Sequence, residues 1–403
     1  MAGEALSNAR VDEARARMLE AVAPLVRTER LALGEARGRI LAEDVIAQRD
    51  QPPFAASAMD GYALRAADTP GTLRVIGEAS AGAGLARALQ AGEAARIFTG
   101  APLPAGADCI AIQEDVTREG DMIAAPATAP GRHVRAQGLD FKAGARLLAA
   151  GARLDGVALA LAAASGAAQL AVRARPRVAL LATGDEIVAP GETPGPHQIF
   201  ESVSFGLAGL IEEWGGEAIR LAARGDDVDA LAAAAREGFA QADLLLTIGG
   251  ASVGDRDLVK PALKTLGLGL DVERVAVRPG KPVWFGTAAA GPALGLPGNP
   301  ASALVCAHLF LRPILARMLG LAPAARFVRA RLAAPLAGNG PREQYLRARL
   351  DLDEDGRARV MPFEQQDSSL LSVFRDANAL IRLAPGGAAM AEGALVDVLA
   401  LER

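Results

Sequence analysis

At 403 residues the chain exceeds what one hydrophobic core usually supports, so about two to four domains are expected. Hydrophobic residues make up 51% of the chain and charged residues 22%, a composition that excludes extensive disorder. The net charge of -4 provides no positive field for a nucleic-acid backbone, so we expect no nucleic-acid partner.

The cysteines and the N-terminal residues exclude further classes of protein. Neither Cys109 nor Cys306 has a Cys or His neighbour at the spacing of a zinc site, so we expect ordinary buried thiols. Residues 1–18 contain acidic side chains and lack the apolar core of a signal peptide. The alanine-rich stretch 157–168 is too short to cross a bilayer. We therefore expect a cytoplasmic protein with no membrane contact.

The first part of the chain predicts helices interrupted by strands. An amphipathic helix is expected at 11–26 and another helix at 155–165. Four strand-like runs lie between them, at 73–76, 95–98, 109–113 and 122–124. We predict a helical or mixed domain made of residues 1–50 and 131–174, with a β-rich domain inserted at 51–130.

From about residue 177 to 320, short aliphatic runs alternate with longer amphipathic stretches, the pattern of βαβ units in a parallel sheet. Strands are expected at 178–183, 217–221, 243–248, 272–277, 283–285 and 294–296. Helices are expected at 203–214, 229–241, 257–266 and 300–319. We predict a doubly wound parallel α/β domain over 175–322, whose ligands bind beyond the carboxyl ends of its strands.

The remaining residues, 323–403, show short alternating runs separated by glycines and predict a small C-terminal β domain. The predicted fold class is therefore multidomain, with a central α/β domain between a helical part that carries a β-rich insertion and a terminal β domain.

Two loops that contain glycine and carboxylates follow strands of the predicted α/β domain, Thr183–Glu186 and Gly249–Asp257. Glycine lets the backbone approach a ligand, and exposed N–H groups beside a hydroxyl can donate to an oxyanion. The carboxylates would repel a bare phosphate, so a bridging Mg²⁺ would reconcile the two features. A plain turn at Gly184 and Asp185, and an N-cap at Asp257, are the structural alternatives.

Two further loops add cationic and anion-binding groups. Arg278–Pro282 places two cations on either side of a Pro-Gly turn, an arrangement suited to clamping a doubly charged oxyanion. A solvated turn is the alternative, but we expect this loop at the same sheet edge as the acidic loops. Gly295–Ser302 opens the long helix, and its backbone amides with Ser302 can form another anion site.

Outside the α/β region, segments 52–63 and 98–104 carry Asp60 and Thr99 beside tight turns, and a structural role is the alternative for both. The three histidines are far apart and lack a nucleophile elbow, which argues against a hydrolase triad. His308 lies on the apolar face of the last α/β helix, where we expect a core role.

Six motifs taken in order resemble the molybdopterin molybdenumtransferase family, which comprises bacterial MoeA and the E domain of gephyrin and its plant counterpart. They are SAMDGYA (57–63), IFTGAPLP (97–104), ATGDE (182–186), GGASVGDRD (249–257), RPGKP (278–282) and GLPGNPASA (295–303). The resemblance runs over nearly the whole chain. It implies that adenylylated molybdopterin is cleaved at its phosphate anhydride, AMP leaves, and molybdate is placed on the dithiolene sulfurs. It also implies a Mg²⁺ ion and a homodimer whose site lies between subunits.

The resemblance also implies roles for individual positions. The acidic residues near the pterin phosphate and the metal are Glu186, Asp226 and Asp257, which with Asp60 and Lys281 form the expected catalytic set. The molybdate pocket takes Ser252, Arg278, Lys281, Pro282 and Ser302, with Arg342 and Ser369 from the terminal domain. Thr183 and Gly250 line the pterin-phosphate pocket, and the other substrate-binding positions are Gly184, Asp185, Gly249, Pro297 and Asn299. Asp60, Thr99 and Asp140 belong to the partner-subunit side.

Two departures and two alternative functions accompany this resemblance. Glu201-Ser202-Val203 stands where the family usually has Asp-Ser-Asn, which removes an amide and bears on substrate affinity; Arg278 replaces a more common Lys. The alternatives are a non-catalytic scaffold, as in gephyrin, and the related adenylyltransferase that acts one step earlier. That adenylyltransferase is also a candidate partner.

Overall fold

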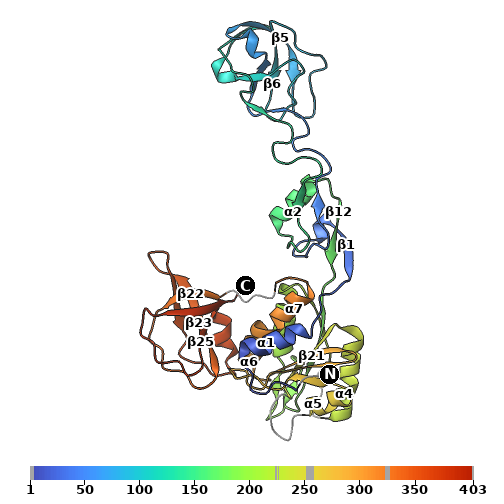
Figure 1. Cartoon of the computed structure of the whole chain (residues 1–403), viewed down its shortest axis with the longest axis vertical. Coiled ribbons are helices and arrows are strands. Elements are labelled where there is room, and N and C mark those ends of the chain that lie inside the picture. Colours follow the sequence, from blue (N-terminus) through green and yellow to red (C-terminus); the bar gives the residue numbers. More distant parts are fainter. Residues whose placement is uncertain (1–3, 223–224, 226, 251–257, 323–326, 402–403) are drawn as a thin grey trace. The chain divides into compact units, whose positions relative to one another are not determined.

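The chain divides into two compact units, residues Met1–Arg27 with Arg173–Arg403 and residues Thr28–Val172. The structure, a computed structural model, describes residues 4–222, 225, 227–250, 258–322 and 327–401. Both units contain β-sheets, and the sheets differ in the order in which their strands pair (Figure 1).

A six-stranded sheet forms the centre of the first unit. Its strands in spatial order are β16 (Glu217–Arg220), β13 (Arg177–Ala182), β17 (Leu244–Ile248), β21 (Gly291–Leu296), β20 (Trp284–Ala288) and β18 (Gly269–Val272). The first four strands run parallel, as strands joined by crossover helices do.

The other two strands run antiparallel and extend the predicted parallel sheet at one edge. The β20–β21 ladder ends with Ala288 opposite Gly291, so two residues connect the strands. A parallel pair needs a crossover of about a dozen residues or more, whereas a two-residue connection forces a hairpin. The predicted strand 272–277 also divides, because its last residue begins β19 (Val277–Arg278), which joins another sheet.

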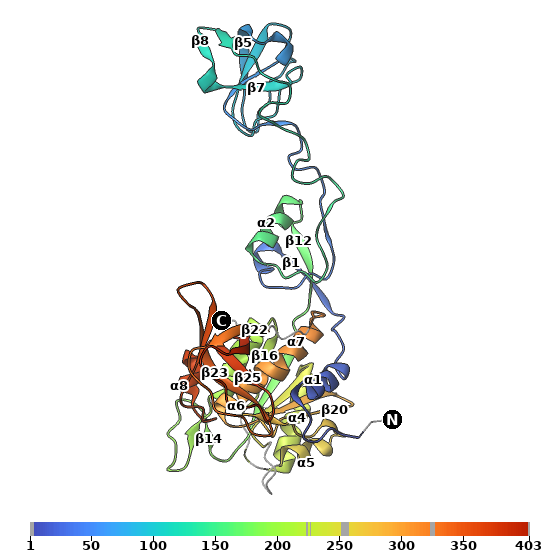
Figure 2. The same cartoon turned by 60° about the vertical axis from the view of Figure 1, so that its left-hand side comes forward.

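Helices cover both faces of this sheet, which confirms the predicted doubly wound α/β fold. They are α3 (Val203–Glu213), α4 (Val228–Gln241), α5 (Val259–Lys264), α6 (Pro300–Cys306) and α7 (Arg312–Met318). Along β13, Val178 and Leu180 face the core beneath α3, α6 and α7, whereas Ala179 and Leu181 face the core beneath α4 and α5. Figure 2 shows α4 and α5 together on one side of the unit. Alternation of this kind gives a parallel strand its continuous apolar run.

The predicted helix at 300–319 forms as one helical segment with a π-helical turn, η4 (Ala307–Leu311), between α6 and α7. Pro313 follows that turn and has no backbone N–H, which removes one α-helical hydrogen bond and favours the wider turn. Pro300–Met318 is long and apolar enough to cross a membrane, but 83% of its apolar window is buried within the fold, as in a core helix.

Helix α1 (Val11–Glu20) packs in the first unit, although we predicted residues 1–50 as part of the neighbouring domain. Its fully buried side chains are Val11, Ala14 and Met18, and they join the core formed by α7 and the sheet. The predicted helix 11–26 is shorter than expected; Pro24 disfavours helical conformation in the residue before it. The N-terminal segment is thus part of the α/β core.

The C-terminal part of the first unit is a small β domain, as predicted. Its strands are β22 (Phe327–Leu332), β23 (Glu343–Leu352), β24 (Ala358–Pro362), β25 (Ala379–Leu383) and β26 (Leu395–Ala400), with helix α8 (Leu371–Asp376) before β25. The order β23-β24-β22-β26-β25 closes on itself because β25 also pairs with β23. Closure leaves these five strands no long free edge.

The second unit contains a mixed part with its own core. Its elements are β1 (Thr28–Ala32), η1 (Leu33–Glu35), β2 (Val45–Ile46), β11 (Arg146–Leu148), α2 (Gly156–Ala164) and β12 (Gln169–Arg173). Strands from distant parts of the sequence pair here, β1 with β12 and β2 with β11. The Asp155 side chain caps α2 by accepting from the Ala158 N–H at 2.8 Å.

The β-rich segment lies between these paired strands. Its six-stranded sheet contains, in spatial order, β7 (Cys109–Ile112), β4 (Gly61–Leu64), β6 (Glu93–Ile97), β5 (Gly71–Ala79), β9 (Met122–Ala125) and β8 (Thr117–Glu119). Short elements beside it are β3 (Ala56–Ser57), η2 (Ala66–Asp68), η3 (Gln113–Asp115) and β10 (Val134–Arg135). Both cysteines of the chain are buried and free, as expected, and burial raises the pKa of Cys109 to about 12.

We expect Gly295→Ala to destabilise the α/β domain. Gly295 pairs with Trp284 across the β20–β21 hairpin, and a Cβ at position 295 would overlap the buried indole. Overpacking of this kind costs about 1–3 kcal/mol. Denaturant unfolding followed by tryptophan fluorescence measures the loss.

Gly209→Ala is the matched control, since Gly209 is an exposed residue of α3 with open space around its Cβ position. We expect that variant to be unchanged or stabilised by up to about 1 kcal/mol through helix propensity. Equal stability of the two variants would contradict the packing at Trp284.

Candidate functional site

Three predicted loops begin side by side at the carboxyl ends of β13, β17 and β21. In the ladder, Ala182 lies opposite Ile248, and Ile248 lies opposite Leu296. The Thr183 N–H donates to the Ile248 carbonyl at 2.9 Å, and the Gly249 N–H donates to the Leu296 carbonyl at 3.1 Å. The loops that start at Thr183, Gly249 and Pro297 therefore form one edge.

Glycine is required where these loops touch. Gly249 has φ 86°, and a Cβ there would lie 2.6 Å from the Thr183 carbonyl oxygen. A Cβ at Gly250 would overlap the Val259 side chain. Gly184 and Gly250 also have positive φ, 141° and 57°. The loops thus pack backbone against backbone, leaving N–H groups rather than side chains at the edge.

Two carboxylates flank this edge. The Glu186 carboxylate folds back toward Gly184, where an added Cβ would lie 2.5 Å from one of its oxygens. The Asp185 carboxylate reaches Gly225, where an added Cβ would lie 2.7 Å from Oδ1. Asp226, Ser252 and Asp257, which we also predicted for the site, lie outside the described residues.

Short strands hold the loop that carries Glu186. β14 (Ile187–Val188) pairs in parallel with β15 (Ile199–Phe200), and the Ile199 N–H donates to the Glu186 carbonyl at 2.7 Å. Within the described ranges, no group of three or more His, Cys, Asp or Glu side chains is arranged to hold a metal ion. Metal binding through Glu186 therefore remains a prediction.

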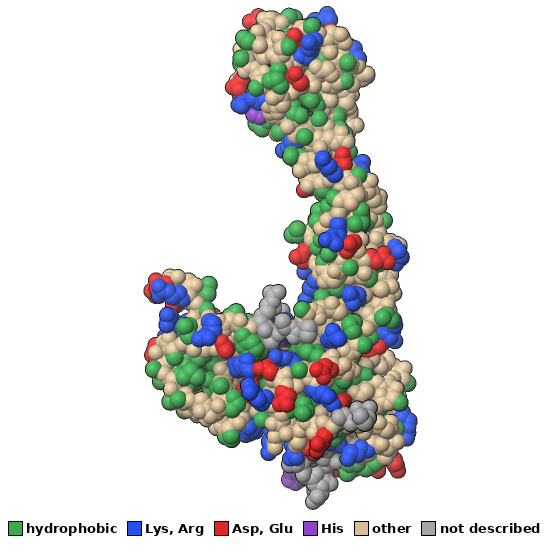
Figure 3. Space-filling model, viewed as in Figure 1, with side chains coloured by type: hydrophobic (Ala, Val, Ile, Leu, Met, Phe, Trp, Pro, Cys, Tyr) green, Lys and Arg blue, Asp and Glu red, His purple; other side chains and the backbone are tan. Residues whose placement is uncertain are grey.

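A separate cavity of about 300 Å³ collects cationic side chains. It is lined by Arg278, Pro279, Gly280, Lys281, Pro282, Ser302, Arg342, Gln344, Tyr345, Leu346, Arg347, Gln366, Asp367 and Ser368. Five of our predicted molybdate-pocket residues are among them: Arg278, Lys281, Pro282, Ser302 and Arg342. On the face of the first unit in Figure 3, basic and acidic side chains are intermingled, whereas the cavity has four cations and one carboxylate in its lining.

The cationic loop reaches this cavity by leaving the α/β sheet, which corrects our expectation that it shares the sheet edge. β19 pairs in parallel with β23 of the C-terminal domain, with Val277 opposite Glu343 and Arg278 opposite Gln344. Gly280, with φ 113°, lets the loop return close to α6, because a Cβ there would overlap the Cys306 sulfur. The cavity therefore lies between the α/β and C-terminal domains.

Sequence reasoning missed Arg347, whose side chain is 2% exposed. Its guanidinium donates to the carbonyls of Asp367 at 2.8 Å and Leu370 at 2.9 Å, and Gln366 accepts from its backbone N–H at 3.0 Å. Burial lowers the pKa of Arg347, opposed by the charge of Asp367. Arg347 thus holds the loop that supplies Gln366 and Ser368 to the cavity. In the sequence, the polar run after β24 is the signal that indicates this loop.

Ser368, rather than the predicted Ser369, lines the cavity. The Asn299 side chain donates to Ser368 Oγ at 3.0 Å, and the Ala301 N–H donates to the Ser368 carbonyl at 3.0 Å. Ser369 instead donates from Oγ to the Asp367 carboxylate at 2.6 Å. The predicted Asn299 therefore links the loop before α6 to the C-terminal domain.

In the second unit, Asp60 and Thr99 form a pair. Asp60 Oδ1 accepts from the Thr99 N–H at 2.8 Å and from Thr99 Oγ1 at 2.9 Å. The backbone hydrogen bond, followed by the hydroxyl bond, lowers the pKa of Asp60 below its ordinary value of 3.8. Arg96 lies over the rings of Tyr62 and Phe98 and adds a smaller effect of the same sign.

The third residue predicted on that side, Asp140, has different neighbours. Its N–H donates to the Gln51 carbonyl at 2.9 Å, in the segment where Gln51 also pairs with Phe141. The structure therefore brings Asp60 and Thr99 together and places Asp140 on another strand connection.

The unusual Glu201-Ser202-Val203 sequence begins α3. Buried Glu201 accepts from the Ser204 N–H at 2.7 Å and from its Oγ at 2.6 Å, and it pairs with Arg220 at 3.5 Å. Val203 is buried in the main core. Hydrophobic packing of α3 thus accounts for the apolar residue at position 203. His308 is also buried, with its ring edge-on to Trp214 at 5.0 Å, as expected of a core histidine.

Comparisons with known families cover nearly the whole chain. Residues 9–166 match the family described as MoeA N-terminal region (domain I and II), and residues 179–317 match the probable molybdopterin binding domain. Residues 329–401 match the MoeA C-terminal region (domain IV).

Individual relatives agree with these matches. A molybdopterin molybdenumtransferase of Nostoc sp. is 39% identical over 81% of this chain and 78% of its own length. A molybdopterin molybdenumtransferase of Haemophilus influenzae is 35% identical over 93% of this chain and 94% of its own length. The crystal structure of the molybdopterin biosynthesis MoeA protein from Pyrococcus horikosii is 32% identical, covers 98% of this chain and 99% of its own, and superposes with a TM-score of 0.84.

Thr99→Val should raise the pKa of Asp60 toward its ordinary value. The variant keeps the backbone N–H bond but removes the hydroxyl donor that favours the charged carboxylate. Because the folded-state pKa is lowered, these bonds stabilise the fold above the ordinary pKa and are lost as pH falls through the lowered value. Carbon-detected NMR titration of the carboxyl group measures the change. Thr117→Val, at an exposed position of β8, is the control; an unchanged Asp60 titration in Thr99→Val would contradict the pairing.

Proposed function

The chain belongs to the MoeA family of molybdopterin molybdenumtransferases, transferases of molybdenum cofactor biosynthesis, and we propose that it inserts molybdate into adenylylated molybdopterin with release of AMP. The observation that carries the proposal is the cationic cavity beside Ser302, next to the loop that begins at Pro297 on the glycine-rich edge. The cationic cavity suits a tetrahedral dianion, and the glycine-rich edge suits a phosphate.

The cavity supports molybdate binding through charge and geometry. Arg278, Lys281 and Arg342 provide cations to one cavity from two domains, as a multiply charged anion requires. Ser302, 4% exposed in the first turn of α6, adds a hydroxyl and the helix N-terminus. Arg347 maintains a further positive charge behind the loop that holds Ser368.

The glycine-rich edge supports binding of the pterin phosphate. Thr183, Gly249 and Gly250 approach one another too closely for other side chains, and loops of this kind direct N–H groups at an anion. Cleavage of a phosphate anhydride depends on positioning and charge neutralisation more than on a covalent nucleophile. Lys281, which lies in the cationic cavity, would balance the charge of the molybdate on which AMP release depends.

We propose that Glu186, with Asp226 and Asp257, holds a Mg²⁺ ion at this edge. Carboxylate oxygens are the ligands that Mg²⁺ prefers, and the exposed Asp185 and Glu186 carboxylates fit that chemistry. Gly225 lies against the Asp185 carboxylate, and Asp185 is the sequence neighbour of Glu186. A bound Mg²⁺ would neutralise negative charge on the phosphate anhydride.

We also propose a cytoplasmic homodimer in which Asp60 and Thr99 of one copy complete the site of the other, with Asp140 on the same side. Support comes from the Asp60–Thr99 pair, an ionised carboxylate held by two donors at an exposed turn of the β-rich segment. The adenylyltransferase that makes the substrate is a candidate partner, because its product is an activated intermediate.

Lys281→Ala should reduce molybdate-dependent AMP release from adenylylated molybdopterin by about a hundredfold or more, the usual effect of removing one donor to a developing anion. Asp257→Asn should have a comparable effect. A coupled assay of AMP with and without molybdate measures both variants, and gel filtration establishes that each retains its oligomeric state. The same assay with EDTA, then with added Mg²⁺, tests the metal.

Lys264→Ala is the control, since Lys264 is an exposed cation at the end of α5. Normal turnover in Lys281→Ala and Asp257→Asn would refute the site. An equal rate of AMP release with and without molybdate would refute the transferase reaction. Absence of AMP release in the unmodified protein would favour a scaffold.

A mixture of Asp60→Asn and Lys281→Ala chains should recover about one quarter of wild-type activity. Random mixing makes half of the dimers mixed, and a shared site leaves one of their two sites intact. Each variant alone should be inactive in the AMP assay. Confirmed heterodimers without activity would contradict a site shared between copies.

A further inference from the structure

The two walls of the cationic cavity belong to different domains. Arg278 ends β19 and Lys281 follows it, whereas Arg342 directly precedes β23 and Gln344 is the second residue of β23. The Arg342 guanidinium also donates to the Val277 carbonyl, next to Arg278, at 3.4 Å. The distance between the cations therefore depends on how β23 is held against β19.

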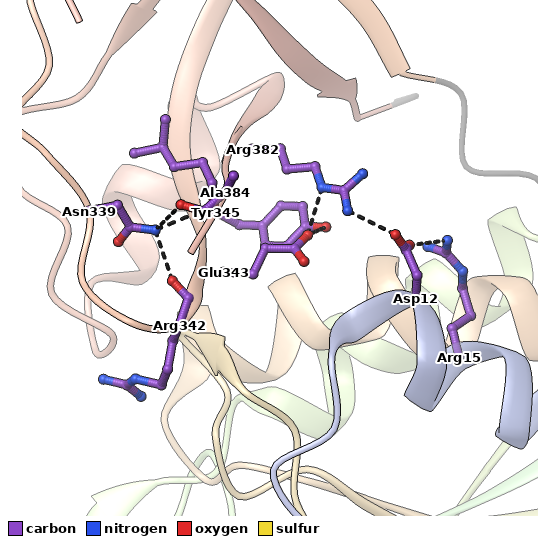
Figure 4. Close-up of polar contacts among 9 residues, drawn as sticks. Asp12, Arg15, Asn339, Arg342, Glu343, Tyr345, Arg382 and Ala384 are labelled. Atoms are coloured by element: carbon purple, nitrogen blue, oxygen red, sulfur yellow. Dashed lines mark hydrogen bonds and ion pairs between the residues drawn. The ribbon is translucent and has the colours of Figure 1, made fainter. Parts of the chain in front are cut away.

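A chain of polar contacts connects β23 to helix α1 (Figure 4). Arg382 donates from Nε to Glu343 at 2.7 Å and from its terminal nitrogen to Asp12 at 2.9 Å. Tyr345 donates to the same Glu343 oxygen at 2.7 Å, and Arg15 donates to Asp12 at 2.6 Å. Asp12 is thus connected through a single arginine to β23, the strand that begins directly after Arg342.

The residues before α1 are bonded to the opposite wall. The Leu6 N–H donates to the Asp271 carbonyl at 3.0 Å, and the Glu273 N–H donates to the Leu6 carbonyl at 2.8 Å. Ala9 continues the pattern, accepting from the Ala276 N–H at 2.8 Å. Residues 271–276 lead directly into β19. Residues 6–15 therefore contact the β19 wall through Leu6 and Ala9 and the β23 wall through Asp12.

Because Glu343 is buried, its carboxylate needs a charged partner and hydrogen bonds. Glu343 is 4% exposed, and a buried carboxylate is destabilising unless it is paired and hydrogen-bonded. Arg382 suits this position because two different nitrogens of its planar fork bond Glu343 and Asp12 at the same time. Burial raises the pKa of Asp12, but the hydrogen bond and charge of Arg382, with Arg15 and Arg10, lower it overall, so Asp12 is ionised at neutral pH.

We propose that residues 6–15, through the Asp12–Arg382–Glu343 bridge, act as a positioning clamp that sets the spacing of Arg278, Lys281 and Arg342 for the tetrahedral oxyanion. The proposal rests on the proposed function only in taking molybdate as that oxyanion. Asp12 and Arg382 are positioning residues: Arg382 bonds Glu343, which lies in sequence between the cavity residues Arg342 and Gln344, and Asp12 acts through Arg382.

The test measures molybdate binding by calorimetry on the full-length protein, together with KM for molybdate and kcat in the AMP assay. Asp12→Asn should raise the Kd and KM about three- to tenfold while kcat changes less, as for residues that act on a site through intervening contacts. Arg382→Gln should raise the Kd more than about tenfold, since it leaves Glu343 unpaired. Asp12→Glu keeps the carboxylate and should restore binding to within about twofold of wild type.

Asp355→Asn is the matched control. Asp355 forms an exposed ion pair with Arg357 at 2.8 Å in the turn between β23 and β24, and its loss should leave the Kd unchanged. If Asp12→Asn binds molybdate as tightly as Asp355→Asn does, the clamp is refuted while the transferase proposal stands. If the unmodified protein binds no molybdate, both proposals fail. Asp12→Asn keeps the test decisive even if Arg382→Gln does not fold.

Discussion

The short parallel pairing of β19 with β23 is the contact on which the cavity depends. It brings Arg278 opposite Gln344 and joins a strand leaving the α/β domain to β23 of the C-terminal domain. Without that pairing, the cationic loop and Arg342 would belong to separate surfaces. Buried Tyr345 and Phe374 of the C-terminal domain join the core that contains α6 and α7, so apolar burial supports the same junction.

Charge is concentrated at this junction in a protein that is acidic overall. Four cations line the cavity with one carboxylate, although the chain has a net charge of -4. Like charges brought together repel, so the surrounding structure must hold them in place. Arg347 is held by carbonyls of the loop it supports, and Arg382, just outside the cavity, is held by two carboxylates. The cationic side chains of the cavity are therefore preorganised for binding an anion.

The glycine-rich loops were predictable because a strand that ends in glycine places its loop at the sheet edge. Thr183, Gly249 and Pro297 follow three parallel strands, and their proximity follows from the fold class. Arg347 was not predictable in the same way. A strand arginine usually faces solvent, and its burial depends on loop carbonyls about twenty residues later in the chain. The pairing of β19 with β23 was equally unpredictable, because β18 and β19 form one apolar run in the sequence.

The sequence by itself determined the fold class, the order of the loops and the chemical character of their side chains. These properties depend on local periodicity, turn residues and the topology of βαβ units, all of which act over short stretches of chain. Only the tertiary structure decided which cations share a cavity, that Ser368 rather than Ser369 lines it, and that α1 belongs to the α/β unit. Those outcomes depend on contacts between residues far apart in sequence, such as Asp12 with Arg382, and local patterns carry no record of such contacts.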